Sequence, residues 1–106
     1  MTSVKEAEQL YVVISRINDA APSSESNAME LFEQHRAYFE DLLDRKLLLG
    51  SGPAKDENGQ RYGGAILILR AKNFDEAREI AAQEPYCREG KRTFEVIPWQ
   101  RKVIGE

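Results

Sequence analysis

One histidine and one glutamate occupy positions where polar side chains are not expected. His35, the only histidine in the chain, lies within about 20° of the middle of the apolar arc marked by Phe32 and Phe39 when residues 28–45 are wound as a helix. In a second, shorter helical segment the same rotation places Glu84 within about 30° of the centre of the buried side. Both side chains are therefore predicted to point inward, from helices on the same face of a sheet.

A pair of such groups could do proton-transfer chemistry. A buried carboxylate needs a partner, because removal from water disfavours its charge. If Glu84 bonds His35, the carboxylate fixes the imidazole tautomer and leaves the other ring nitrogen as a general base or acid near neutral pH. The alternative is a structural histidine bonded to a backbone carbonyl, with Glu84 turned outward at a fraying helix end.

Two further residues are candidates for contacting a ligand. Ser51, in the glycine- and proline-rich segment 50–53, could donate a hydrogen bond, and Tyr86 could present its hydroxyl to a cleft. The alternatives are strand-end geometry for the segment and simple packing for Tyr86. Cys87 is a weaker candidate, because only Arg88 nearby would favour a reactive thiolate.

The elements that must position these residues follow from local patterns. Four apolar segments rich in β-branched residues predict strands, over residues 9–17, 47–53, 62–70 and 92–99, the last continuing to 103 if the chain passes Pro98 as a strand. Two amphipathic segments predict helices, over residues 28–45 and 74–83.

Capping and turn residues refine these boundaries. Asn27 followed by Glu30 has the spacing of a capping box, and Pro53 is expected to close the second strand. Asn58-Gly59 predicts a type I′ hairpin turn, because both residue types tolerate a positive φ.

The element order is β-α-β-β-α-β, which predicts an α+β, ferredoxin-like fold with a four-stranded antiparallel sheet and two helices on one face. With 106 residues, we expect a single domain over residues 1–106. Residues 65–69 form an unbroken apolar run, which is typical of a strand covered on both faces. Two helices cover one face only, so we expect a homodimer that packs sheet against sheet. The alternative is a monomer with an exposed apolar surface.

Composition excludes several function classes. The chain has 15 Lys and Arg residues and 18 Asp and Glu residues, so its net charge is −3. This charge does not favour binding to nucleic acid or to an anionic membrane surface. One cysteine and one histidine are too few for a zinc site, and no cofactor is expected, although a histidine-ligated haem stays open. Without a signal-peptide or membrane-spanning run, a cytoplasmic location is expected.

Several ordered motifs carry a resemblance to a known family. They are EQH (33–35), LLLGSGP (47–53), GAILIL (64–69), AREIAAQEPY (77–86), Gly90 and VIPW (96–99). The chain resembles the YciI-related family, also called the YCII domain, along nearly its whole length. The resemblance implies a dimeric α/β-barrel fold and a site built around a histidine and an acidic residue. The best-defined activity that it implies is a dehydrochlorinase acting on a chlorinated hydroxyhydroquinone.

His35 matches the histidine of the family, whereas Glu84 stands where the family usually has aspartate before Pro-Tyr or Pro-Phe. The extra methylene keeps the charge but displaces the carboxylate, which matters for catalytic geometry. Sequence and resemblance together predict a small dimeric enzyme without a required cofactor. It would use His35 as general base or acid and Glu84 as its orienting partner, with elimination or isomerisation of a small aromatic or enol-type acid. Ser51 and Tyr86 are the expected substrate contacts.

The rival class is a non-catalytic ligand-binding or accessory module on the same fold.

Overall fold

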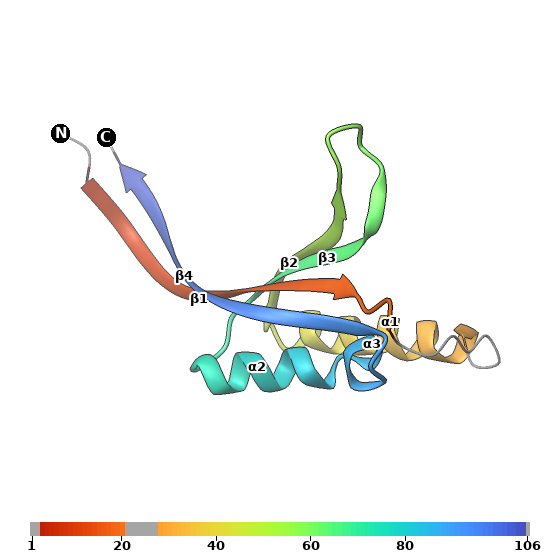
Figure 1. Ribbon diagram of the computed structural model, residues 1–106. Helices are drawn as coiled ribbons and strands as arrows, with labels where there is room; N and C mark the ends of the chain where they lie inside the picture. Colours follow the sequence, from red (N-terminus) through yellow and green to blue (C-terminus); the bar gives the residue numbers. More distant parts are fainter. Residues whose placement is uncertain (1–2, 21–27, 106) are drawn as a thin grey trace.

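The computed structural model of the protein describes residues 3–20 and 28–105. In chain order the elements are β1 (Ser3–Ile17), α1 (Ala28–Asp44), β2 (Leu48–Lys55), β3 (Arg61–Leu69), α2 (Phe74–Gln83), α3 (Pro85–Arg88) and β4 (Arg92–Gly105). The strands form one antiparallel sheet in the order β2-β3-β1-β4, and the helices lie on one of its faces (Figure 1). The predicted ferredoxin-like α+β fold is confirmed. The predicted cap at Asn27 lies outside the described residues.

The hydrophobic core lies between the sheet and the helices. Alternate residues of β1 point toward the helices, and Val13 pairs with Leu67 of β3 on one side and Val96 of β4 on the other. Small side chains on α2 bring its backbone close to the sheet, because Ala77 and Ala81 are both fully covered. The buried residues of this cluster are Tyr11, Val13, Leu42, Leu48, Leu67, Leu69, Ala77 and Ala81.

No helix within the described residues covers the opposite side of the sheet (Figure 1). We call it the open sheet face, formed by Val12, Ile14, Ile66, Ile68, Ile97 and Trp99. Exposed fractions reach 44% for Ile66, 42% for Ile97 and 40% for Trp99. A contiguous apolar surface of this kind is typical of a protein interface.

A bulge in β2 turns Ser51 toward the helices. Leu48 pairs with Leu69 but Gly50 pairs with Ile68, so the register shifts around Leu49. The extra residue restores Ser51 to the helix-facing side, opposite Leu67. Without the bulge the alternation of the strand would point Ser51 to the open sheet face.

The β2–β3 turn differs from the predicted type I′. Gly59 has a φ of +80°, but Asn58 does not share a positive φ. The Asp56 carboxylate instead accepts hydrogen bonds from the backbone N–H groups of Asn58 and Gln60, and Gly59 N–H bonds the Asp56 carbonyl. An Asp side chain that caps its own turn favours a longer loop with a single left-handed glycine.

Two prolines lie inside strands, against the expectation for Pro53 and in agreement with a last strand that continues past Pro98. Pro53 was expected to close the second strand, but it pairs with Ala65 inside β2. Pro98 lies within β4, opposite Tyr11. Both β2 and β4 are edge strands of the sheet, where a missing N–H can face away from the ladder.

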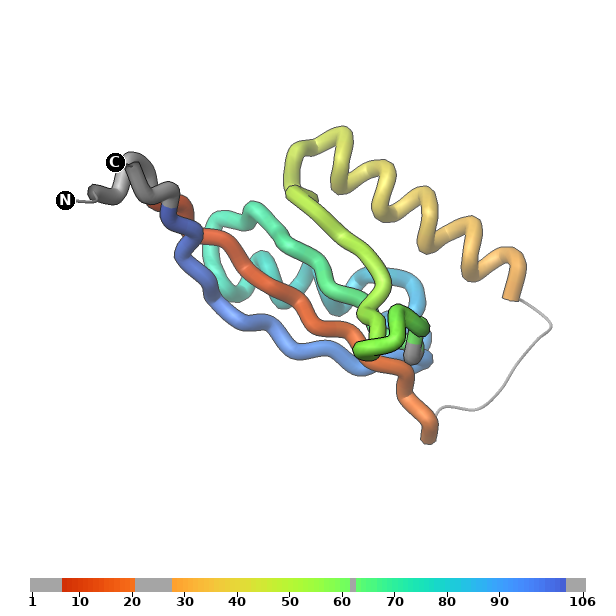
Figure 2. The backbone as a smooth tube through the Cα atoms, turned by 90° about the horizontal axis from the view of Figure 1, so that it is seen from above, coloured from red at the N-terminus to blue at the C-terminus, as the bar shows by residue number. Residues whose placement is uncertain are grey.

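The first helix packs less of its apolar arc than the pattern predicts. Leu31 and Leu42 are buried, yet Phe32 is 46% and Leu43 is 54% exposed. Figure 2 shows the reason: α1 runs along the β2 side of the sheet rather than over its centre. No helix in the described part of the chain is long and apolar enough to cross a membrane.

Candidate functional site

Glu84 lies at the junction of two helices, where it ends α2 and begins α3. Its backbone leaves the helical region with φ −57° and ψ 129°, and Pro85 takes the first helical position of α3. One carboxylate oxygen, Oε2, accepts a hydrogen bond from the Cys87 backbone N–H at 3.1 Å. The inward direction of Glu84 therefore comes from its role as a helix cap. Glu84 follows the last residue of α2, so the helical rotation of α2 does not determine the direction of its side chain.

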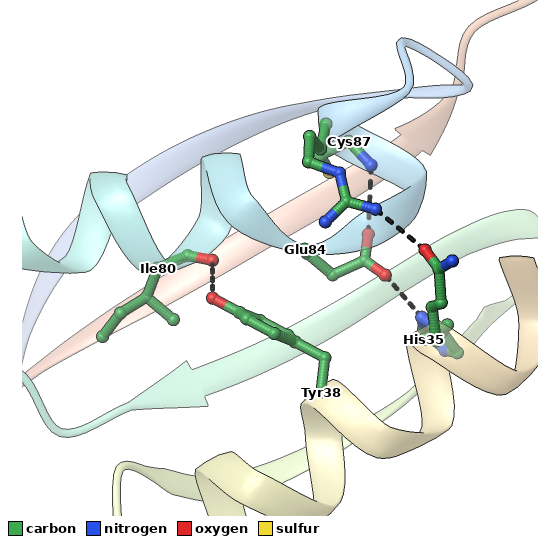
Figure 3. Close-up of polar contacts among 7 residues, drawn as sticks. His35, Tyr38, Ile80, Glu84 and Cys87 are labelled. Carbon is green, nitrogen blue, oxygen red and sulfur yellow. Dashed lines mark hydrogen bonds and ion pairs between the residues drawn. The ribbon is translucent and has the colours of Figure 1, made fainter.

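The other carboxylate oxygen meets the imidazole of His35 (Figure 3). The distance from His35 Nδ1 to Glu84 Oε1 is 2.5 Å, and the two side chains are 18% and 6% exposed. With Nδ1 bound to a carboxylate, the neutral ring carries its proton on Nδ1. Nε2 is then the unprotonated nitrogen, and it has no hydrogen-bond partner among the described residues.

Opposing effects act on the Glu84 carboxyl. Burial by itself raises its pKa, because the charged form loses hydration. The hydrogen bond and charge of His35, with the backbone N–H groups of Cys87 and Tyr86, more than offset burial, so the pKa lies below the ordinary 4.5. At neutral pH Glu84 is therefore a carboxylate, which the His35 imidazole and the backbone N–H groups of α3 stabilise.

Aromatic rings fix the plane of the imidazole. The ring centroids of Phe39 and Tyr86 lie 4.4 Å and 4.8 Å from that of His35, and Phe32 is stacked at 6.4 Å. Phe32 and Phe39 come from the same helix as His35, whereas Tyr86 comes from α3. The ring is thus held from two elements and has little freedom to leave Glu84.

Tyr38 is a supporting residue that sequence analysis did not single out. Its hydroxyl donates a hydrogen bond of 2.7 Å to the Ile80 carbonyl, which ties α1 to α2 (Figure 3). Burial raises the pKa of Tyr38 to about 12, so the hydroxyl stays a donor at any working pH. Tyr38 lies three residues after His35, on the same side of α1. This spacing from His35 is the feature of the sequence that could have identified Tyr38.

A cavity of about 340 Å³ opens beside the imidazole. His35, Ser51 and Tyr86 all line it, so the structure brings three of the four sequence candidates to one cavity. Glu84 does not line this cavity. It borders a small inner void, together with Ser15 and Cys87, and so lies behind the imidazole.

The cavity also holds two arginines that sequence patterns did not identify. Arg61 is the first residue of β3 and Arg92 the first residue of β4, and both line the wall. Arginines at strand ends usually point into solvent, so the sequence alone does not show that Arg61 and Arg92 line a cavity. Gly64 also lines the cavity but has a different role, because a Cβ at this position would approach the Ser15 carbonyl oxygen to 2.8 Å. Glycine at 64 therefore serves strand packing.

Cys87 is poorly suited to nucleophilic chemistry here. Burial and the neighbouring Glu84 charge raise the pKa of its thiol to about 12. Its contribution to the site is its backbone N–H, which bonds Glu84. Among the described residues, no three His, Cys, Asp or Glu side chains gather closely enough to hold a metal ion.

Comparison with known proteins identifies relatives of this chain. The YCII-related domain matches residues 10–100. An uncharacterised protein of Haemophilus influenzae is 30% identical over 88 residues, which cover 78% of this chain and 90% of that protein.

Two solved structures are similar to this chain, and the first of them shares its fold. One is a 5-chloro-2-hydroxyhydroquinone dehydrochlorinase of Burkholderia phenoliruptrix in complex with 2,5-dihydroxybenzoquinone, at 21% identity and a TM-score of 0.62, covering 85% of this chain and 92% of that chain. A protein of Shewanella oneidensis gives 12% identity and a TM-score of 0.48, covering 97% of this chain and 99% of that chain. The domain match and the identity to the Haemophilus protein lead to one conclusion: this chain belongs to the YCII-related domain family.

Proposed function

We propose that this protein is a small enzyme that catalyses proton transfer coupled to elimination or isomerisation, with His35 as general base or acid. The observation that carries the proposal is the contact between His35 Nδ1 and Glu84 Oε1 beside a cavity that His35 lines and Glu84 does not. A base needs one free nitrogen toward substrate and one held nitrogen behind it. Glu84 is the positioning residue, because it acts through the imidazole.

The reaction begins when Nε2 of His35 takes a proton from the substrate. The electron pair left behind moves into the conjugated system of the substrate. It then either expels a leaving group as an anion, in an elimination, or recovers a proton from the imidazolium at another carbon, in an isomerisation. Glu84 stabilises the imidazolium between these steps without taking its proton. Ser51 and Tyr86, which line the same cavity, are the proposed substrate contacts.

A small aromatic or enol-type acid is the proposed substrate class. Such molecules release a proton to give a delocalised anion, which lowers the demand on a single imidazole. The cavity of about 340 Å³ accepts one ring with its substituents, between the side chains of Phe32, Phe39 and Tyr86. The dehydrochlorinase with the same fold is named for a substrate of this class, which supports the proposal by analogy.

We also propose a homodimer formed through the open sheet face. Ile66, Ile97 and Trp99 leave about two fifths of their surface in water, which is costly for side chains of this size. A second copy presents a matching apolar surface, and a twofold axis lets the two sheets cover each other.

Chloride release from 5-chloro-2-hydroxyhydroquinone is the first assay for this function, alongside a panel of enolic and aromatic acids. We expect turnover by the unaltered protein and a loss of about 10²-fold or more in kcat for His35→Ala. Arg78→Gln, an exposed change on α2, is the matched control and should leave turnover unchanged. Equal turnover by His35→Ala would contradict the proposal. Binding of these acids by the unaltered protein without any turnover would favour the non-catalytic module instead.

A further inference from the structure

The cavity carries positive charge that the proposed proton transfer does not use. Arg61 and Arg92 line it, and neither makes an ion pair with any residue in the described part of the chain. The Glu84 carboxylate is already bound to His35 and to the Cys87 backbone. A protein with a net charge of −3 thus has a cationic hollow. Such a hollow attracts anions from solution.

Arg92 is held in a definite orientation. Its guanidinium carbon lies 4.6 Å from the centroid of the Tyr86 ring, and the same ring lies 4.8 Å from that of His35. Stacking on an aromatic face leaves the N–H groups at the edge of the guanidinium free to donate. The cation and the base therefore share one aromatic neighbour, and a ring-sized ligand can reach both.

One donor of Arg92 lacks a hydrogen-bond partner among the described residues. Its Nε is buried and has no hydrogen-bond partner in the described structure. Arg92 borders both the large cavity and the inner void behind Glu84, so it lies between the two spaces. Because Nε has almost no accessible surface, an oxyanion in the cavity would bind the terminal nitrogens of the guanidinium.

We propose that Arg92, assisted by Arg61, binds a planar oxyanion of the ligand, either a carboxylate or an enolate. This contact fixes the ligand so that its reacting atom faces Nε2 of His35. The orienting role rests on the proposed function, whereas anion binding does not require turnover. The ligand class is thereby narrowed to acids that are already ionised when they enter the cavity. Arg92 is a specificity-determining residue, distinct from the base.

The test compares an anion with its neutral isostere at equilibrium. Benzoate and benzamide have nearly the same shape, and 2,5-dihydroxybenzoquinone supplies an enolate in place of a carboxylate. Amide chemical shifts are followed by NMR titration for the unaltered protein and for Arg92→Gln, Arg92→Lys and Arg61→Gln. Arg78→Gln is the control, because Arg78 stacks on Phe94 outside the cavity. Unchanged spectra and melting temperatures establish that the variants are folded.

We expect the unaltered protein to bind benzoate at least about tenfold more tightly than benzamide at low salt. Arg92→Gln should remove this preference, and Arg92→Lys should keep part of it, because lysine lacks the planar fork. Arg61→Gln tests the assisting residue and should give a smaller loss. If either kind of oxyanion can bind, the variants should lose affinity for 2,5-dihydroxybenzoquinone in the same order as for benzoate. Tighter binding of one of these two probes shows whether the site prefers a carboxylate or an enolate.

Two results would overturn the inference: equal affinity for benzoate and benzamide, or a preference that survives in folded Arg92→Gln. These failures are distinguishable from failure of the proposed function. If His35→Ala turns over normally while Arg92→Gln loses the anion preference, only the proton-transfer proposal is wrong. If turnover needs His35 while the preference for benzoate survives in Arg92→Gln, only the anion site is wrong.

Discussion

Glu84 contacts His35 with one carboxylate oxygen and caps α3 with the other. The same side chain therefore sets the helix junction and the orientation of the imidazole, 49 residues away in the sequence. This dual contact links stability to the proposed chemistry, because any change at Glu84 alters both.

The Glu84 carboxyl should make stability depend on pH in the acid range. Its pKa in the folded protein lies below 4.5, so its stabilising contribution is complete above that pH and is lost as pH falls through the lower folded value. We expect the free energy of unfolding to fall more steeply below pH 4.5 in the unaltered protein than in Glu84→Gln. Urea unfolding across pH 2.5 to about 6 measures the difference. Parallel curves would contradict the assignment.

Tyr38→Phe should destabilise the protein by about 1 kcal/mol, because it removes the donor for the buried Ile80 carbonyl and leaves the ring in place. Urea denaturation at neutral pH checks this value. Tyr11→Phe is a matched control, because Tyr11 is also buried but its hydroxyl makes no hydrogen bond within the described part of the chain. A larger loss for the control would show that the link between α1 and α2 is not the source.

Cys87→Ser should leave activity and fold nearly unchanged, because the contact to Glu84 comes from the backbone N–H of this residue. The raised pKa of about 12 also predicts slow alkylation by iodoacetamide in the folded protein. Mass spectrometry at timed intervals, with urea-unfolded protein as the reference, measures the rate. Rapid alkylation of folded protein at neutral pH would contradict the buried thiol.

Ile97→Asp should dissociate the proposed dimer, because it places a charge on the open sheet face, where Ile97 is 42% exposed. Analytical ultracentrifugation at micromolar concentration should give a dimer for the unaltered protein and a monomer for the variant. Arg78→Asp, on the helix side, should remain dimeric. A stable monomer of the unaltered protein would refute the dimer directly.

Regular periodicity made the fold predictable from the sequence. The apolar runs at residues 9–17 and 65–69 and the amphipathic arc around Leu31 and Leu42 identify the sheet and its first helix. The four-residue helix α3 was missed, because it is too short to show any period. Pro85 follows the predicted helix over residues 74–83, and proline is common at the start of a helix as well as after the end of one.

The site was predictable only in part. His35 is conspicuous because it interrupts an apolar arc, whereas the inward direction of Glu84 was inferred from a rotation that the structure does not have. Arg61 and Arg92 belong to strand ends far apart in the sequence, and only the folded sheet brings them to one cavity. Ser51 reaches its wall through a bulge that no local pattern marks.

The tautomer of His35 tests the central claim most directly. Long-range ¹H–¹⁵N NMR of the imidazole, at a pH where the ring is neutral, reports which nitrogen carries the proton. We expect the proton on Nδ1 and a bare Nε2 in the unaltered protein, and a loss of this preference in Glu84→Gln, which can no longer hold Nδ1–H with a charged acceptor. A proton on Nε2 in the unaltered protein, or the same spectrum in both proteins, would contradict the account.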